Sequence, residues 1–185
     1  MLPRRSFWYL RHGETDWNAA NLSQGTVDIP LNPTGIAQAQ NAAQLLRGRG
    51  IRSIVSSPLS RARETAAAAA AVIGRPVLIE EELHEVAFGN QEGEPMGDWY
   101  DDWIAGHYTP EGAEPFAALR ARAVRALGRA VAQESPVLVV AHGALFRAIR
   151  AEMNLPISVR TPNAMPLFCE PGADAADPWT LTPAA

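Results

Sequence analysis

The segment FWYLRHGET, residues 7–15, decides the fold of this chain because a short apolar strand leads directly into polar residues. The run Phe7–Leu10 is continuously apolar and bounded by charge, which is the pattern of a buried strand. His12 follows it, and the glycine after His12 lets the backbone or a ligand approach the imidazole closely. The planar donor fork of Arg11 suits a phosphoryl group. The segment therefore predicts an anion site at the end of a strand.

A second histidine with the same neighbour lies far downstream, in the segment AHGA at residues 141–144. It follows the unbroken apolar run Val137–Ala141, which fits a central parallel strand covered on both faces. Ligands of open α/β sheets bind beyond the carboxyl ends of the strands. We therefore expect His12, His142 and Arg61, each just past a predicted strand, to share one pocket.

Strands alternate with helices and short turns along the rest of the chain, which predicts a three-layer α/β/α sandwich. Thr34 is expected to cap the first helix, with Ile36 on its buried face. Six consecutive alanines, residues 66–71, favour a helix packed closely against the sheet. The pattern places strands at about 51–56 and 77–80, an irregular strand before residue 168, and helices at about 34–46, 60–73, 96–104, 115–132 and 144–153.

Length and composition predict one domain over residues 1–185. Residues 90–116 form an insert, expected to act as a lid, and the tail at 171–185 is expected to be mobile. All sixteen basic residues are Arg, which excludes Schiff-base chemistry and a lysine-dependent phosphate loop. The net charge of −4 gives no field for nucleic acid.

The single Cys169 allows no internal disulfide and makes a zinc cluster improbable. The apolar run at the N-terminus is too short for a signal peptide or a membrane span, so we expect a cytoplasmic protein without membrane contact. The oligomeric state stays open, with a homodimer among the compatible states. No metal and no organic cofactor is expected.

An ordered set of motifs over about residues 6 to 150 resembles the histidine phosphatase superfamily, also called phosphoglycerate mutase-like. The resemblance implies a mostly parallel sheet with one antiparallel strand, and a phosphomonoesterase of the histidine acid phosphatase type. The matching positions are Arg11-His12-Gly13, Asn18, Gln24-Gly25, Asp28, Pro30-Leu31, Gly35, Ser57-Pro58-Leu59-Ser60-Arg61-Ala62, Thr65-Ala66, Leu83, Glu85, Gly89, Glu92-Gly93 and His142-Gly143.

The resemblance implies that His12 attacks phosphorus and becomes a phosphohistidine. Such a nucleophile must be neutral, with one ring nitrogen free and the other held by a hydrogen bond. Arg11 and Arg61 would grip the phosphoryl oxygens, and His142 would add a charge-assisted donor. Glu85 matches the family acid, which protonates the leaving alkoxide and then activates water.

Other polar residues carry weaker expectations. Glu14 is a second candidate for the acid, and Glu81, Glu82 and His84 make the assignment of Glu85 ambiguous. The N–H of Gly143 opens a helix and favours the same anion. By resemblance Asn18, Gln24 and Gly25 contact phosphate, although loop solvation explains them equally well; Trp17 is expected to anchor their loop, and Arg63 to lie on the surface.

The insert favours a phosphatase that acts on a small-molecule phosphate monoester over a phosphoglycerate mutase. Residues 76–119 contain no Arg or Lys, whereas a mutase must clamp a substrate carboxylate and a second phosphate. The insert also looks too small to shield a phosphohistidine from water. If a clamp existed, it would have to come from Arg120, Arg122 or the Arg4-Arg5 end.

The insert also holds an aromatic cluster, Trp99, Tyr100, Trp103 and Tyr108. These rings could stack on a flat base such as that of α-ribazole phosphate, or Trp99 and Trp103 could simply bury one helix face. Two further readings stay open at this point: a non-catalytic phosphate-binding module, and a metal hydrolase built from the two histidines and a carboxylate.

Overall fold

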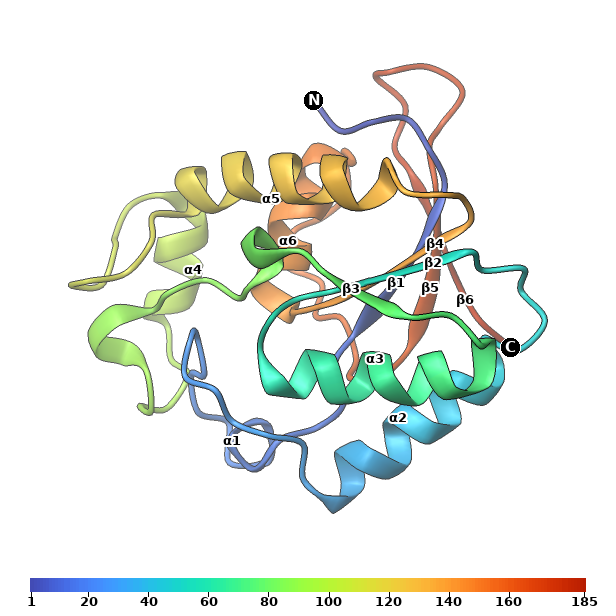
Figure 1. The fold of residues 1–185 in the computed structure, drawn as a ribbon. Coiled ribbons are helices and arrows are strands. Elements are labelled where there is room, and N and C mark those ends of the chain that lie inside the picture. Colours follow the sequence, from blue (N-terminus) through green and yellow to red (C-terminus); the bar gives the residue numbers. More distant parts are fainter.

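The computed structural model describes residues 1–185 and contains one six-stranded sheet between two layers of helices (Figure 1). Strands from β3 to β1 pair in parallel, whereas β5 is antiparallel to both of its neighbours, β1 and β6. β5 is thus the one strand that runs against the rest, as the resemblance implies. In spatial order the strands are β3 (Val77–Ile79), β2 (Ser53–Ser56), β4 (Val137–Ala141), β1 (Phe7–Arg11), β5 (Pro166–Glu170) and β6 (Thr180–Pro183).

The long helices cover the two faces of the sheet in pairs. One pair is α2 (Pro33–Leu45) and α3 (Ser60–Ile73), and the other is α5 (Phe116–Val131) and α6 (Gly143–Glu152), on the opposite side in Figure 1. The predicted three-layer sandwich is therefore confirmed. Shorter elements lie at one end of the sheet: α1 (Asp16–Ala19), α4 (Trp99–Ala105) and the 3₁₀ turns η1 (Glu81–Leu83) and η2 (Gly89–Gln91).

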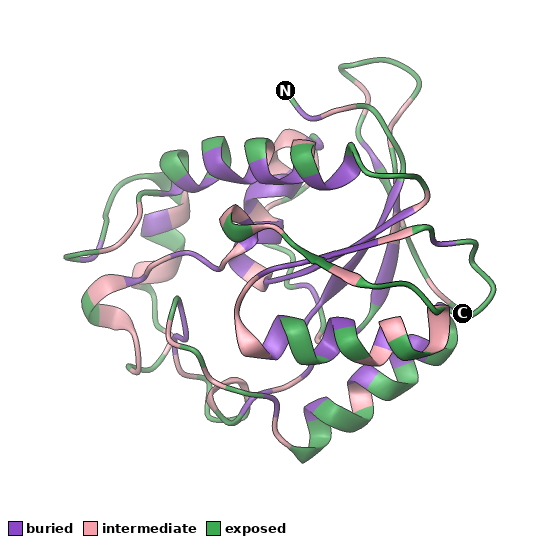
Figure 2. Cartoon of the chain, in the orientation of Figure 1, coloured by how far each residue is buried: buried purple, intermediate pink, exposed green.

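Alternation along the central strands divides the core into two apolar clusters. In β1, Phe7 and Tyr9 join the cluster under α5 and α6, whereas Trp8 and Leu10 join the cluster under α2 and α3. β4 divides its side chains in the same way, and all five of its residues are buried. Figure 2 shows these buried strands between helices whose outer faces are exposed. The prediction of a central strand covered on both faces is confirmed.

Strand register brings the motif residues to one edge of the sheet. Arg11 of β1 lies opposite Ala141 of β4, and Ser56 of β2 lies opposite Val140. The next residue of each strand therefore leaves the sheet at the same level. His12, Ser57 and His142 emerge together, and the first turn of α3 follows Ser57 closely.

Several local predictions were wrong in instructive ways. Asn32, not Thr34, caps α2, because its side chain accepts from the Gly35 N–H and Pro33 occupies the first helical position. Ile36 is 46 % exposed, since the small residues Ala39, Ala42 and Ala43 already fill the buried face. The loop after β1 contains α1, which a capping box between Thr15 and Asn18 stabilises.

The tail expected to be mobile is held by the sheet. Thr180–Pro183 forms β6 along β5, and the preceding Trp179 is buried with its ring 6.0 Å from that of Phe7. The alanine helix is confirmed: Ala66 and Ala69 of α3 are fully buried in the cluster shared with α2. Small side chains there let the helix approach the sheet closely.

Candidate active site

His12 lies at the centre of a cavity at the carboxyl edge of the sheet, and only 2 % of its surface is exposed. Its Nδ1 lies 2.7 Å from the carbonyl oxygen of Gly13, so Nδ1 carries the proton and donates it to this bond. Nε2 then carries the free lone pair of the imidazole. Burial, with Arg61 and Arg11 nearby, lowers the pKa of His12 well below its usual value. The imidazole is therefore neutral at neutral pH, as a nucleophile must be.

Arg11 and Arg61 are buried in the same cavity, and backbone carbonyls hold both guanidinium groups. Arg11 Nη1 donates to the Thr161 carbonyl at 2.7 Å. Arg61 donates through its two terminal nitrogens to the carbonyls of Val27 and Gly25, each at 2.8 Å. The Nε atom of each arginine is buried without a hydrogen-bond partner in the chain. These orphaned donors beside His12 define a site for an anion.

His142 is fully buried, with its ring centroid 5.3 Å from that of His12. Its Nε2 lies 2.6 Å from Ser57 Oγ, whereas Nδ1 has no partner. Its backbone carbonyl and N–H both bond the hydroxyl of Tyr9, which fixes the start of α6 on β1. Burial and the charge of Arg61 lower the pKa of His142 well below its usual value. The structure therefore favours a neutral imidazole, whose N–H can still donate to an anionic oxygen.

Close backbone contacts hold the loop that carries His12. Gly13 donates its N–H to Thr65 Oγ1 of α3 at 3.0 Å, and a Cβ on Gly13 would lie 2.4 Å from the Gly35 oxygen. Asn163, which sequence reasoning missed, donates from its amide to the His12 carbonyl at 3.0 Å. The loop that carries His12 is thus fixed from α3, from the start of α2 and from the segment before β5.

Asn18, Gln24 and Gly25 all line the cavity, so the structure brings them to the site with His12. The Asn18 side chain caps the Thr15 N–H, and Gln24 Oε1 accepts from the Thr15 hydroxyl at 2.8 Å. Gly25 has φ +54°, and a Cβ there would overlap the Glu92 carboxylate, so only glycine fits. Trp17 lies outside the cavity against Gly93, which agrees with its predicted role as an anchor.

Glu85 is the only carboxylate that lines the cavity, and it is buried. Its oxygens accept the backbone N–H groups of Ala144 and Leu145 at 2.9 Å each, and that of Val86 at 3.0 Å. The N–H groups at the start of α6 thus bind this carboxylate, whereas the sequence predicted that this helix start would bind the phosphoryl anion. Gly143 still lines the cavity, where its missing side chain makes room for the Arg11 guanidinium.

Neighbouring acids do not compete with Glu85 for the site. Glu82 faces outward and pairs with Arg125 and Arg129 on the surface of α5. Glu14 accepts from the Asn32 amide at 3.0 Å and lies outside the cavity. Of the carboxylates that the sequence offered, only Glu85 lines the cavity. Arg63 is exposed on α3, as predicted.

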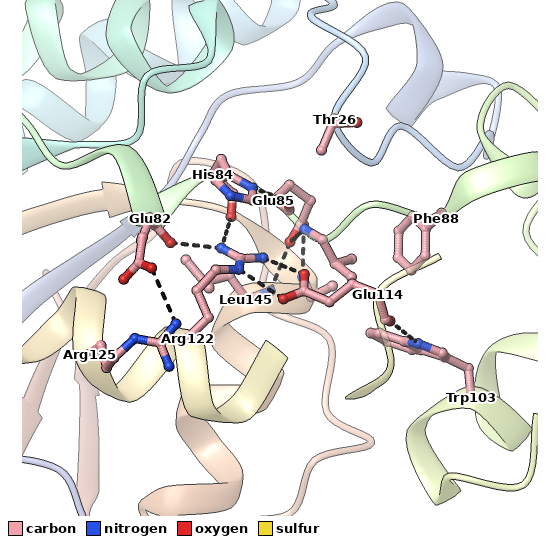
Figure 3. Close-up of polar contacts among 12 residues, drawn as sticks. Thr26, Glu82, His84, Glu85, Phe88, Trp103, Glu114, Arg122, Arg125 and Leu145 are labelled. Carbon is pink, nitrogen blue, oxygen red and sulfur yellow. Dashed lines mark hydrogen bonds and ion pairs between the residues drawn. The ribbon is translucent and has the colours of Figure 1, made fainter. Parts of the chain in front are cut away.

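Arg122 of α5 braces the segment that carries Glu85 (Figure 3). Its Nη1 donates to the carbonyls of Glu82 and His84, at 2.7 and 2.8 Å. Its Nε and Nη2 grip the Glu114 carboxylate with two bonds, at 2.9 and 2.7 Å. One guanidinium thus ties the Glu85 segment, the end of the insert and α5 together. The contacts with the Glu82 and His84 carbonyls had no signal in the sequence, because these partners are backbone atoms about 40 residues away.

The acidic residues of the insert do not face the cavity. Glu92 accepts from the Thr26 and Phe88 N–H groups, and Glu114 is paired with Arg122. From residues 90–116 only Met96 and Tyr100 line the cavity. The acidic insert therefore does not make the cavity acidic. Its composition is no longer an argument against a substrate with a second anionic group.

The aromatic cluster of the insert is mainly a packing device. Trp103 is fully buried, with rings of Phe88, Tyr100 and Phe116 at 5.1 to 5.3 Å from its own. Trp99 packs on Phe88, and Tyr108 is exposed. Trp103 is thus buried as the packing interpretation predicts, whereas Trp99 is only partly buried against the same cluster. Of the four aromatic residues of this cluster, only Tyr100 lines the cavity, together with Phe88 from outside the insert.

The cavity has a volume of about 190 Å³. Three lining residues that sequence reasoning missed are Arg147, Arg160 and Thr161. Arg147 lies four residues after Gly143 on α6, so helical spacing could have found it. Arg160 and Thr161 belong to a coil between α6 and β5, where no periodicity predicts direction. The arginines proposed as a clamp lie elsewhere: Arg120 pairs with Glu152, Arg122 with Glu114, and Arg4 contacts the Gly172 carbonyl.

Comparison with known proteins assigns this site to a class. The histidine phosphatase superfamily (branch 1) matches residues 7–167. Glucosyl-3-phosphoglycerate phosphatase of Mycolicibacterium vanbaalenii is 33 % identical over 169 residues, which cover 80 % of this chain and 74 % of that protein. The adenosylcobalamin/alpha-ribazole phosphatase of Escherichia coli is 32 % identical over 159 residues, which cover 79 % and 77 %.

A solved structure of a mycobacterial glucosyl-3-phosphoglycerate phosphatase in complex with VO3 aligns with 97 % of this chain and 98 % of its own. The TM-score is 0.83 and the sequence identity 30 %. This chain belongs to the histidine phosphatase superfamily. None of its helices is long and apolar enough to cross a membrane, and no three His, Cys, Asp or Glu side chains are grouped to hold a metal ion.

Proposed function

We propose that this chain is a phosphomonoesterase of the histidine acid phosphatase type, with His12 as the nucleophile. The observation that carries the proposal is the neutral imidazole of His12, held through Nδ1 and placed beside two buried arginines with free donors. A neutral nucleophile and fixed cationic donors are what attack on a phosphate dianion requires.

In the first step, Nε2 of His12 attacks phosphorus in line with the ester oxygen. The P–N bond forms as the P–O ester bond breaks, and the leaving alkoxide takes a proton from protonated Glu85. Arg11, Arg61 and His142 donate to the phosphoryl oxygens, where they stabilise negative charge in the transition state. Asn18, Gln24 and the backbone of Gly25 and Gly143 complete the lining around these oxygens.

In the second step, water attacks the phosphohistidine from the side that the alcohol has left. Ionised Glu85 takes the proton from this water, the P–O bond forms, and the P–N bond breaks to release phosphate and restore His12. Glu85 is well placed for both directions of transfer, because the N–H groups of Ala144 and Leu145 fix its carboxylate at the cavity wall.

Hydrolysis is the outcome that the insert favours over transfer to a second substrate. Its one helix, α4, has seven residues, and only two residues of the insert reach the cavity. A mutase must keep water from its phosphohistidine, and this cover is small for that task. We therefore expect phosphate release to exceed interconversion of 2- and 3-phosphoglycerate, even with a bisphosphoglycerate primer present.

The substrate is a small phosphate monoester, or the phosphate end of a larger one that extends into solvent. Ligand pockets for drug-sized molecules enclose roughly 300 to 1,000 Å³, and this cavity, at about 190 Å³, is smaller. The two relatives compared above are named for a glucosyl phosphoglycerate and for α-ribazole phosphate. Tyr100, Phe88 and Met96 offer either leaving group one apolar wall.

The test is hydrolysis of p-nitrophenyl phosphate by wild-type protein and by His12→Ala. The variant should lose at least about 10³-fold in kcat, since no other group can accept the phosphoryl. His107→Ala, a surface histidine, is the matched control and should keep wild-type turnover. Persistent turnover by His12→Ala would overturn the assignment of the nucleophile.

A further inference from the structure

The cavity carries more positive charge than one phosphoryl group needs. Four arginines line it, Arg11, Arg61, Arg147 and Arg160, against the single carboxylate of Glu85. The whole chain, by contrast, has a net charge of −4. With both histidines neutral, a phosphate dianion would leave the lining with a surplus of positive charge. Charge concentrated in a cleft without counter-ions favours a more highly charged ligand.

Arg147 and Arg160 form the part of this charge that the phosphoryl site does not use. Arg147 Nη1 donates to the carbonyls of Ile157 and Ser158, and its guanidinium lies 5.1 Å from the centre of the Tyr100 ring. Arg160 is exposed at the mouth of the cavity. Neither pairs with a carboxylate, whereas the five arginines at 52, 120, 122, 125 and 129 all do.

Thr161 supplies an independent pointer to a ligand at the same place. Thr161 lines the cavity and is 4 % exposed, and its buried hydroxyl has no hydrogen-bond partner in the chain. A buried hydroxyl without a partner is costly unless a ligand satisfies it. Its carbonyl accepts a hydrogen bond from Arg11, so Thr161 adjoins the phosphoryl site. Arg160 is close enough that, after burial, its charge is the main cause of the lowered pKa of Arg11, about 10.

We propose that Arg147, Arg160 and Thr161 form a second anion subsite beside the phosphoryl site, which selects monoesters that carry another anionic group, a carboxylate or a second phosphate. The proposal rests on the proposed phosphatase function and names its substrate class. The subsite comes from α6 and the coil after it, on elements outside the insert. The insert supplies Tyr100, which orients Arg147 and covers the carbon skeleton between the two anions.

The test compares substrates that differ only in the second anionic group. For a carboxylate, the pair is 3-phosphoglycerate and glycerol 3-phosphate. For a phosphate, it is propane-1,3-diol bisphosphate and the corresponding monophosphate, with the bisphosphate rate halved for its two equivalent esters. We expect wild-type kcat/KM to favour the doubly substituted member of at least one pair by about tenfold or more, the usual effect of a hydrogen bond to a charged group.

Arg160→Met removes the exposed member of the subsite and should reduce this preference at least about fivefold. Arg147→Met should do the same, although it also releases the carbonyls of Ile157 and Ser158, so Arg160→Met is the decisive variant. Arg63→Met removes an exposed arginine away from the cavity and should keep the wild-type preference. A wild-type preference near one for both pairs, or a preference that Arg160→Met leaves intact, would overturn the subsite.

Calorimetric Kd values for the same pairs, measured with His12→Ala so that no ester is consumed, separate the two proposals. A Kd ratio that depends on Arg160, together with a wild-type protein that hydrolyses none of these esters, would retain the subsite and reject the phosphatase. Turnover of p-nitrophenyl phosphate with equal Kd values within each pair would retain the phosphatase and reject the subsite.

Discussion

At the scale of single residues, the site depends on the protonation state of its two histidines. Both imidazoles are enclosed with two arginines, so their proton affinity is reduced by burial and by positive charge. The hydrogen bond from Nδ1 of His12 to Gly13 then leaves one defined lone pair. The environment that keeps both imidazoles neutral therefore makes the folded state resist protonation.

This resistance predicts a loss of stability in mild acid. Below the unfolded pKa of about 6.5, the unfolded chain binds a proton at His12 that the folded chain does not, so the free energy of unfolding falls as pH falls. Between pH 7.5 and 5.5 the contribution of one such histidine is about 1.4 kcal/mol. In urea titrations at both pH values, His12→Gln should show a correspondingly smaller loss than wild type.

The control for this experiment is His107→Gln, which alters an exposed histidine. It should retain the wild-type dependence of stability on pH. Equal pH dependence in wild type and His12→Gln would mean that His12 does not titrate differently in the folded and unfolded chains.

Glu85→Gln tests the acid and base role at the same scale. The variant should lose about 10²-fold or more in kcat with glycerol 3-phosphate, whose alkoxide needs a proton, and much less with p-nitrophenyl phosphate, whose leaving group does not. Glu14→Gln, at a carboxylate outside the cavity, is the matched control and should show no dependence on the leaving group. Similar losses of Glu85→Gln with both esters would assign Glu85 a structural role.

Sequence and structure agree best at the residues that follow strands. His12, Arg61 and His142 could be placed together because strand ends fix where the next residue lies. Glu85 needed the resemblance, since several acids surround it and only the contacts with α6 single it out. Arg160, Thr161 and Asn163 lie in irregular coil, where the direction of a side chain depends on tertiary contacts that a pattern does not contain.

At the scale of elements, the site is assembled by contacts that tie separate segments to α5 and α6. Arg122 is the clearest, because one side chain holds two carbonyls next to Glu85 and the carboxylate of Glu114. Elements with strong periodicity, such as β4 and the alanine helix α3, were predictable. β6 was missed because it is short, polar and stabilised mainly by pairing with β5 and by the buried Trp179 before it.

Glu114→Gln should weaken this assembly. It removes the charge opposite a largely buried arginine, and we expect the free energy of unfolding to fall by about 2 kcal/mol. This loss is smaller than the roughly 3 to 5 kcal/mol of a fully buried pair, because Glu114 is partly exposed. Because the Glu85 segment is loosened as well, kcat with glycerol 3-phosphate should fall more than kcat with p-nitrophenyl phosphate. Urea titration and steady-state kinetics measure the two effects.

Glu134→Gln is the matched control, since it breaks an exposed pair with Arg52 and should change stability by less than about 0.5 kcal/mol. If Glu114→Gln were as stable as this control, the ion pair would not brace the site. If Glu114→Gln were stable and its dependence on the leaving group were unaltered, Arg122 would not position Glu85.

At the scale of the whole molecule, one sheet edge brings together the groups that the proposed mechanism uses. β1, β2 and β4 deliver His12, Arg61 and His142, and the segment after β3 delivers Glu85. The insert covers this edge with an apolar wall and leaves a cavity of about 190 Å³ at its base. In the proposed mechanism, these groups serve as phosphoryl acceptor and proton donor.

The most direct test of the proposed phosphohistidine mechanism is to follow the phosphoryl group during one turnover. Wild-type protein mixed with ³²P-labelled 3-phosphoglycerate and quenched in alkali within milliseconds should hold acid-labile phosphate on His12, located by mass spectrometry of its peptide. After a chase with unlabelled ester, this label should appear as inorganic phosphate and not in 2-phosphoglycerate. Label on a serine, no label on the protein during active turnover, or transfer of the label to a second phosphoglycerate would contradict it.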